Sequence, residues 1–155
     1  GILISAQKEY EEKKIFYIGN LYANIVFDKE IDKEFANYLL VTINKLTFRQ
    51  FCLIFIFNDS IKYELDIKIR IQGFEYKENK KTNYLSKYIR GDIKQEIFDL
   101  INYGIIEGEK NLIVLNSFTL SYLGKIIFKL MNLDEMQESD FINLVNNIKG
   151  IDFGD

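Results

Sequence analysis

The stretch LTFRQFCLIFIF, Leu46–Phe57, decides the fold of this chain. Thr47 is followed three residues later by Gln50, which fits a capping box in which each side chain binds the other residue's backbone N–H. A buried strand is the alternative, because periodicity cannot separate a strand from a helix in so apolar a run. We favour the helix because of the cap, and we expect it to be the central core helix, buried all round. Its apolar residues are Phe48, Phe51, Cys52, Leu53, Ile54, Phe55, Ile56 and Phe57.

The composition is that of one folded domain, or of two small lobes that share a core. The chain has 155 residues, of which 48% are hydrophobic, and a net charge of −3. Cys52 is the only cysteine, so no disulfide can form within the chain and we expect a cytoplasmic location. No apolar run is long enough for a membrane span, and residues 1–6 do not resemble a signal peptide. Because the chain begins without methionine, we expect a piece of a longer protein.

Two helices are predicted in residues 1–46. The first covers Tyr10–Phe27 and has apolar side chains on two faces, which implies two packing partners. The second covers about Asp32–Leu46 and has a single apolar stripe, so it covers the core from outside. We expect a homodimer through Tyr10–Phe27, with Tyr17 and Leu21 in the interface. The alternative is that a preceding region, or the last helix, covers this face within one chain.

Residues 47–155 contain a mixture of helix and strand signals. Leu65–Gln72 alternates apolar and polar residues, which predicts a strand, and Tyr84–Ile89 is predicted as a short helix. The helix predicted at Ile93–Tyr103 ends before Gly104, at a position where a left-handed cap favours glycine. A β-hairpin follows, with predicted arms at 105–106 and 112–115, and two amphipathic helices complete the chain.

This order of elements is that of a winged helix, in which the hairpin is the wing and Ile93–Tyr103 takes the place of the recognition helix. The predicted fold is therefore mainly α, with minor α+β character. An N-terminal helical pair, residues 1–46, packs on a winged-helix-like lobe, residues 47–155, with a small β-hairpin. We expect the two parts to form one compact unit. A winged helix is a scaffold that serves many functions, so the function must be argued from its surface.

The charge of that surface makes nucleic acid an unlikely partner. The exposed positions of the predicted recognition helix carry a net charge of −1, as does the hairpin tip at 107–111, so both would repel phosphates. Residues 62–94 instead hold nine basic and five acidic side chains, with tyrosines that could stack on bases. A nucleic-acid-binding regulator that uses this segment is the alternative function, although a solvated loop is the simpler interpretation. The candidate contacts are Lys80, Lys81, Tyr84, Lys87 and Arg90.

We expect no enzymatic activity, and we assign no catalytic, cofactor-binding or metal-binding residue. The chain has no histidine, the usual general base and the commonest transition-metal ligand, and no glycine-rich phosphate motif. Cys52 lies in the most apolar stretch, where cysteine is usually a small hydrophobic residue. A carboxylate hydrolase with a hard cation is a third hypothesis, but solvation and the helix dipole explain its acids more simply. Those acids are Asp134, Glu135, Glu138 and Asp140.

Several segments resemble one known family. These segments are an amphipathic helix over 13–27, followed by LTFRQFCLIFIF, IFDLINYGIIEG and LIVLNSFTLSYLGKIIFKL. Together they are similar to the C-terminal part of the abortive-infection alpha proteins and related bacterial proteins of unknown function. The spacing from Thr119 to Gly124 is longer than in that pattern. The resemblance implies a role in bacterial defence against phage and carries over no catalytic residue. Together with this resemblance, the sequence leads us to expect that the chain functions as a non-enzymatic protein-interaction or regulatory module. The matching residues are Leu100, Gly104, Ile105, Ile106, Thr119 and Gly124.

Overall fold

The computed structural model describes residues 1–63, 65, 68–69, 89–108 and 113–149, and these are mainly helical. The helices are α1 (Ile2–Phe27), α2 (Lys33–Lys45), α3 (Phe48–Asn58), α4 (Gly91–Asn102), α5 (Tyr122–Leu130) and α6 (Glu138–Lys149). Short 3-10 turns are η1 (Ser60–Tyr63), η2 (Leu115–Ser117) and η3 (Leu133–Glu135). The strands are β1 (Lys68–Ile69), β2 (Ile106–Glu107), β3 (Ile113–Val114) and β4 (Thr119–Leu120). The predicted class, mainly α with a small antiparallel β-component, is confirmed.

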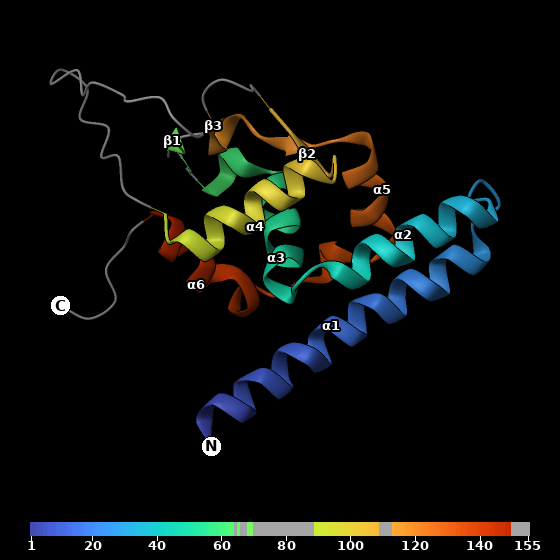
Figure 1. Ribbon diagram of the computed structural model, residues 1–155, viewed down its shortest axis with the longest axis horizontal. Coiled ribbons are helices and arrows are strands. Elements are labelled where there is room, and N and C mark those ends of the chain that lie inside the picture. The colour runs from blue at the N-terminus through green and yellow to red at the C-terminus, as the bar shows by residue number, and fades with distance from the viewer. Residues whose placement is uncertain (64, 66–67, 70–88, 109–112, 150–155) are drawn as a thin grey trace, which may run out of the picture.

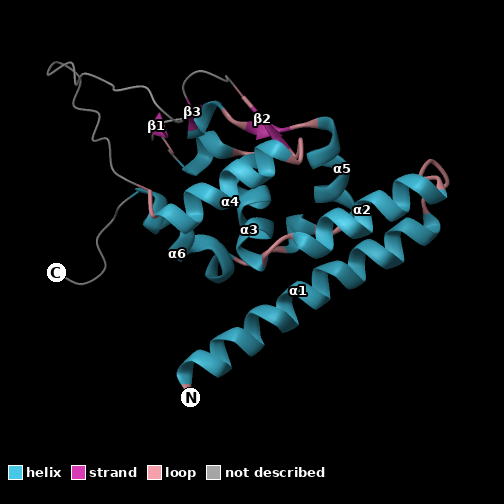
Figure 2. Ribbon diagram, in the orientation of Figure 1, coloured by secondary structure: helices cyan, strands magenta, loops and turns pink. Residues whose placement is uncertain are grey.

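Helix α3 is the central helix, as predicted from its cap. The Thr47 hydroxyl accepts the Gln50 backbone N–H at 3.1 Å, and the Gln50 side-chain oxygen accepts the Thr47 N–H at 2.9 Å. Eight of the eleven residues of α3 are buried. The helix contacts α1, α4, α5 and α6, which surround it, while the strands lie at the edge of the molecule away from α1 (Figure 2).

Helices α1 and α2 form an antiparallel pair beside this core (Figure 1). The Asp32 carboxylate caps α2 by accepting the Phe35 N–H at 2.7 Å, and the predicted one-sided stripe is present because Leu39, Thr42 and Ile43 are buried. The short connection after α2 forces a steep crossing, and α2 and α3 meet at 110°. The buried residues of α1 and α2 belong to the same core cluster as those of the rest of the chain.

Helix α4 ends in a Schellman motif at the glycine that the sequence indicated. Gly104 has a φ of 70°, in the left-handed region that glycine adopts without strain. Its N–H donates to the Ile101 carbonyl at 2.9 Å, and the Ile105 N–H donates to the Leu100 carbonyl at 3.0 Å. Leu100 and Ile105 are both fully buried, so this turn fixes the direction in which the chain leaves α4.

Helix α5 packs unusually close to that turn. The Ser121 hydroxyl caps the helix by accepting the Gly124 N–H at 3.0 Å, and the Ser121 N–H donates to the Ile105 carbonyl at 2.9 Å. A Cβ on Gly124 would lie 2.1 Å from the Ile105 carbonyl oxygen, so only glycine permits this approach. Gly124 is therefore a packing residue at the contact between α5 and the segment that follows α4.

The strand pairing differs from the predicted hairpin. Residues 105–106 and 112–115 were expected to pair with each other, but Ile106 lies opposite Leu120 in the β2–β4 pair, and Ile69 lies opposite Ile113 in the β1–β3 pair. Tertiary burial decides this register, because Ile106 and Leu120 are both buried. Lys68 and Ile69 confirm part of the strand predicted at Leu65–Gln72, whereas the short helix predicted at 84–89 falls almost wholly outside the described residues.

Candidate functional site

Helix α1 is much longer than the sequence indicated, and only one of its sides faces the core. It begins at Ile2 and not near Tyr10, because residues 2–9 contain neither glycine nor proline to stop it. Its N-terminal part projects away from the rest of the molecule (Figure 1). Two of its 26 residues are buried, Tyr17 and Leu21. Most of the surface of α1 is therefore left accessible by the rest of the chain.

The inner side of α1 is held to the core by aromatic rings and one ion pair. The Tyr17 ring lies 6.3 Å from that of Phe48 and 6.4 Å from that of Phe51, measured between centroids. Burial raises the pKa of Tyr17 to about 12. The Lys13 Nζ lies 2.7 Å from a carboxylate oxygen of Asp140 in α6, and the hydrogen bond to Asp140 raises the pKa of Lys13. These contacts fix which side of α1 is left for solvent.

Two asparagines fasten the second half of α1 to the end of α5. Asn24 donates to the Leu130 carbonyl at 2.7 Å, and Asn20 donates to the Met131 carbonyl at 3.1 Å. The last carbonyls of a helix lack partners within the helix, so these amides satisfy groups that would otherwise be unpaired. Sequence reasoning missed this contact, although asparagines at i and i+4 on an apolar helix were a signal that could have indicated it.

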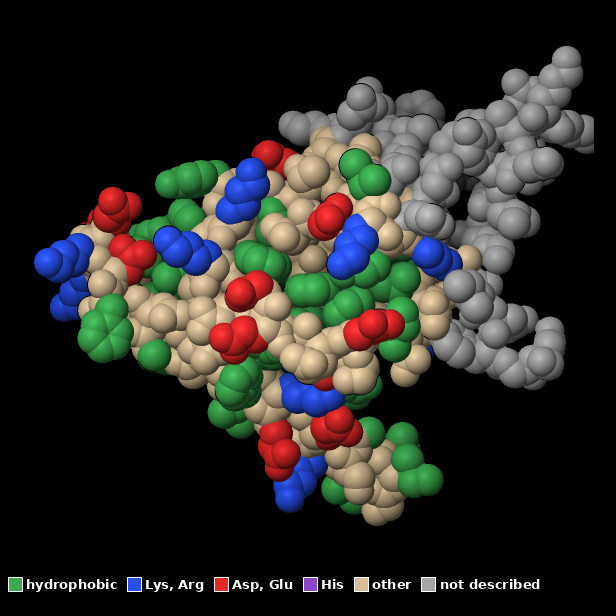
Figure 3. Space-filling model, turned by 180° about the vertical axis from the view of Figure 1, so that it is seen from behind, with side chains coloured by type: hydrophobic (Ala, Val, Ile, Leu, Met, Phe, Trp, Pro, Cys, Tyr) green, Lys and Arg blue, Asp and Glu red, His purple; other side chains and the backbone are tan. Residues whose placement is uncertain are grey.

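The opposite side of α1 is exposed along its whole length, and we call it the outer face. Its residues recur every three or four positions, so they share one side of the helix. Ile15, Tyr22 and Val26 have exposed fractions of 65%, 51% and 78%, although all three are large and apolar. Figure 3 shows the N-terminal end of α1 projecting below the body, with hydrophobic side chains beyond a group of charged ones. The outer face consists of Ile4, Lys8, Glu11, Ile15, Gly19, Tyr22 and Val26.

The structure corrects the residues that were predicted for the interface. Tyr17 and Leu21 were expected to meet a partner, but they are 5% and 0% exposed and belong to the core. The helical stripe containing Ile15 and Tyr22 is the exposed one, because α5 and α3 cover the side that carries Tyr17 and Leu21. Periodicity could not tell which apolar residues of α1 the chain would cover: Ile18 and Ile25 pack against the core with Tyr17 and Leu21, whereas Phe16 is 55% exposed.

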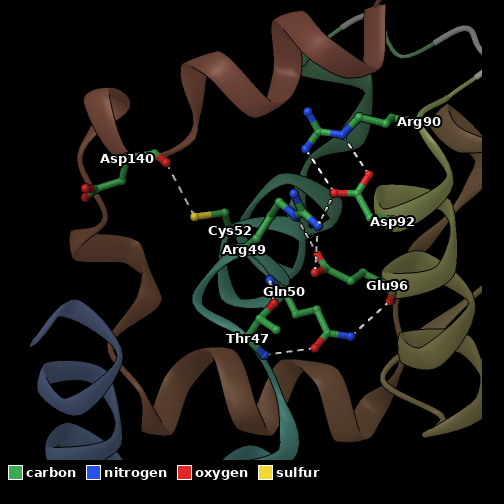
Figure 4. A network of polar contacts seen from close by, with 8 residues as sticks. All are labelled: Thr47, Arg49, Gln50, Cys52, Arg90, Asp92, Glu96 and Asp140. Atoms are coloured by element: carbon green, nitrogen blue, oxygen red, sulfur yellow. Dashed lines mark hydrogen bonds and ion pairs between the residues drawn. The ribbon is translucent and has the colours of Figure 1, made fainter. Parts of the chain in front are cut away.

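Of the predicted basic contacts, the structure describes Arg90 alone, since Lys80, Lys81, Tyr84 and Lys87 lie outside the described residues. Arg90 is exposed and bonds Asp92 in α4, with its Nε 2.7 Å from Oδ1 (Figure 4). That hydrogen bond is the main reason why the pKa of Asp92 lies well below its usual range. The charge of Arg90 is thus partly balanced within the chain.

Arg49 at the start of α3 joins the same network and ties α3 to α4 (Figure 4). Its guanidinium bonds Glu96 through two nitrogens, at 2.7 and 2.8 Å, and its Nη2 lies 2.9 Å from Asp92. The Gln50 amide also donates to the Glu96 carbonyl at 3.2 Å. Glu96, one of the exposed polar positions expected on the predicted recognition helix, is therefore engaged with α3, and the network has a structural role.

Cys52 is not placed to act as a nucleophile. It is 2% exposed, and its Sγ lies 3.5 Å from the Asp140 carbonyl oxygen, to which the thiol donates (Figure 4). Burial raises the pKa of the thiol to about 12, so the thiol stays protonated at neutral pH. This agrees with its interpretation as a small hydrophobic residue.

The acidic residues of the third hypothesis do not converge on one point. Asp140 pairs with Lys13 and accepts the Gln137 N–H at 3.2 Å, while Asp134, Glu135 and Glu138 are exposed. Within the described part of the chain, no group of three or more acidic or cysteine side chains has the arrangement of a metal site. Asp140 thus serves the start of α6 and the attachment of α1.

Among the described residues, no single helix is long and apolar enough to cross a membrane. Helices α2 and α3 reach that length and hydropathy only as a pair, which is bent by 110°.

Comparisons with known proteins identify no relative of this chain. Neither the family models, nor the curated proteins, nor the solved structures give a match.

Proposed function

We propose that this chain is a non-enzymatic protein-interaction module that presents the outer face of α1 to a protein partner. The supporting observation is the exposure of Ile15, Tyr22 and Val26 on a helix whose other side is fixed to the core by Tyr17 and Leu21. Single exposed apolar residues are ordinary on protein surfaces, but a row of them at helical spacing is typical of a surface that a partner covers. The geometry of α1 therefore favours binding over chemistry.

We also propose a biological role for this binding module, which is defence against phage. The resemblance of IFDLINYGIIEG and of the segment around Gly124 to the abortive-infection alpha proteins suggests a bacterial cytoplasmic protein that acts in defence against phage. The residues that carry this resemblance are structural, since Gly104 ends α4 and Gly124 permits the close approach of α5. The proposed binding role thus rests on the outer face of α1, and the defence role rests on the resemblance.

Photo-crosslinking in a bacterial host tests the binding role. A photoreactive phenylalanine at Ile15 is expected to crosslink one discrete partner protein, because this side chain lies in the middle of the outer face and is 65% exposed. The same group at Tyr122, which is 81% exposed on α5, is the matched control and should give no discrete product. An equal result at both positions, or no product from Ile15, would contradict the proposal.

A phage challenge tests the defence role separately. Cells that express the chain should give fewer plaques than cells without it, and Ile4→Glu together with Ile15→Glu should abolish the protection. Both side chains are more than half exposed, so these changes should leave the fold intact, which circular dichroism can verify. Equal plaque numbers with and without the chain, across a panel of phages, would contradict a defence role while leaving the binding role open.

A further inference from the structure

We infer that the partner of the N-terminal half of the outer face, Ile4–Ile15, is a second copy of this chain, and that the two α1 helices pair antiparallel about a two-fold axis between Lys8 and Glu11. In this arrangement Lys8 lies opposite the partner's Glu11, and Ile4 lies opposite the partner's Ile15. The inference rests on the proposed function, because it names the protein that this half of the outer face binds.

The pattern of side chains along the outer face is self-complementary. Ile4, Lys8, Glu11 and Ile15 follow one another at spacings of four, three and four residues, so the series reads apolar, basic, acidic, apolar. The spacings are the same in both directions. Two such helices in antiparallel orientation therefore place each lysine against a glutamate and each isoleucine against an isoleucine. Parallel helices in register would instead place Lys8 against Lys8 and Glu11 against Glu11, which is repulsive.

The four side chains are exposed in the single chain. Ile4 and Ile15 are 71% and 65% exposed, and Glu11 is exposed as well. Lys8 lies 3.9 Å from Glu12 on its own helix, but both side chains are largely in solvent, where such a pair contributes little. Lys8 is therefore free to exchange this weak contact for one across the interface.

The shape of the molecule leaves room for a second helix. The N-terminal part of α1 projects from the body, and the first ring contact of α1 with the core is that between Tyr10 and Phe48, at 5.9 Å (Figure 1). A helix that lies along Ile4–Ile15 on the outer face is on the opposite side from Tyr17, Leu21 and the core. In an isologous contact of this kind, every favourable pair occurs twice.

Charge reversal provides the first test. The mass of the unmutated chain, measured by analytical ultracentrifugation from one to a hundred micromolar, should rise from monomer to dimer. Lys8→Glu and Glu11→Lys should each weaken the dimer about tenfold or more, because each creates two like-charge contacts by symmetry. The double variant restores both pairs and should recover the affinity. Lys29→Glu, in the exposed connection after α1, is the matched reversal and should change nothing.

Disulfide trapping tests the register. On mild oxidation, a chain with Ile4→Cys mixed with a chain with Ile15→Cys should give a cross-linked heterodimer, whereas each variant alone should give little product. The buried Cys52 should not interfere. A monomeric mass at every concentration would overturn the inference, as would a dimer in which Ile4→Cys links to itself or in which charge reversal has no effect. If the photoreactive group at Ile15 still crosslinks a different protein in such a case, the proposed binding role stands and only the second copy is wrong.

Discussion

Helices α3 and α1 are both rich in apolar residues, yet they differ completely in what covers them. Eight of the eleven residues of α3 are buried, against two of the 26 in α1. Helix α3 has neighbours on every side, whereas α1 lies at the periphery and has neighbours on one side only. An apolar face must be covered by a partner, but the face does not specify whether that partner lies in the same chain or in another molecule. In α3 the chain supplies the partner, and in α1 we propose that a second copy does.

The largest expected effect is the loss of a core ring from α3. Phe51→Ala should lower the free energy of unfolding by about 3–5 kcal/mol, because Phe51 is fully buried. Phe27→Ala removes the same ring from the end of α1, where it is 83% exposed, and should change stability by less than about 0.5 kcal/mol. Urea denaturation measures both. A loss below about 1 kcal/mol for Phe51→Ala would show that α3 is not the centre of the core.

Gly124 in α5 and Gly19 in α1 differ in the same way, because the first lies against another segment and the second faces open space. Gly124→Ala should destabilise the chain by about 1–3 kcal/mol, because the new Cβ would collide with the Ile105 carbonyl oxygen. Gly19→Ala adds a methyl group in open space within α1 and should stabilise the folded monomer by about 0.5–1 kcal/mol. Thermal denaturation at low protein concentration measures both changes. Effects of the same sign at the two positions would contradict the described packing of α5.

The polar contacts between α3 and α4 should contribute less to the free energy of unfolding than the core contacts of α3. Arg49→Leu should cost about 1–2 kcal/mol of stability, since it removes a two-nitrogen contact to Glu96, whose side chain is 15% exposed. Arg90→Leu is the matched control, and it should cost less than about 0.5 kcal/mol because Arg90 lies mostly in solvent. Denaturation in urea at neutral pH distinguishes the two, and equal costs would show that the Arg49 contact is no better than a surface pair.

The smallest expected effect is a dependence on pH. The pKa of Asp92 lies below its usual range because Arg90 and Arg49 bond the carboxylate. Its contribution to stability is therefore complete above the ordinary aspartate pKa of about 4 and is lost as the pH falls below that value. Because the side chain is 47% exposed, Asp92→Asn should cost less than about 1 kcal/mol at pH 7 and less still at pH 3. Asp134→Asn, at an exposed acid, should cost nothing at either pH.

Sequence reasoning identified the local signals and missed the distant contacts. The capping box at Thr47 and the glycine at position 104 depend on residues within one turn of each other, and both were predicted correctly. Strand pairing depends on residues far apart, and Ile106 was assigned to the wrong partner. The network of Arg49 with Glu96 joins residues 47 positions apart, so no local pattern could indicate it.

The sequence by itself determined that the chain is mainly helical, that α3 is its centre, and that α1 has more apolar side chains than one covered side of a helix can hold. These properties follow from periodicity and caps, which act over three or four residues. The tertiary structure alone decided that Tyr17 and Leu21 face the core while Ile15, Tyr22 and Val26 face solvent. The physical reason is that periodicity shows only that apolar residues of α1 recur at helical spacing, and not which of them other elements will cover. The choice between them is made by the elements that pack against it, here α3 and α5 with the amides of Asn20 and Asn24.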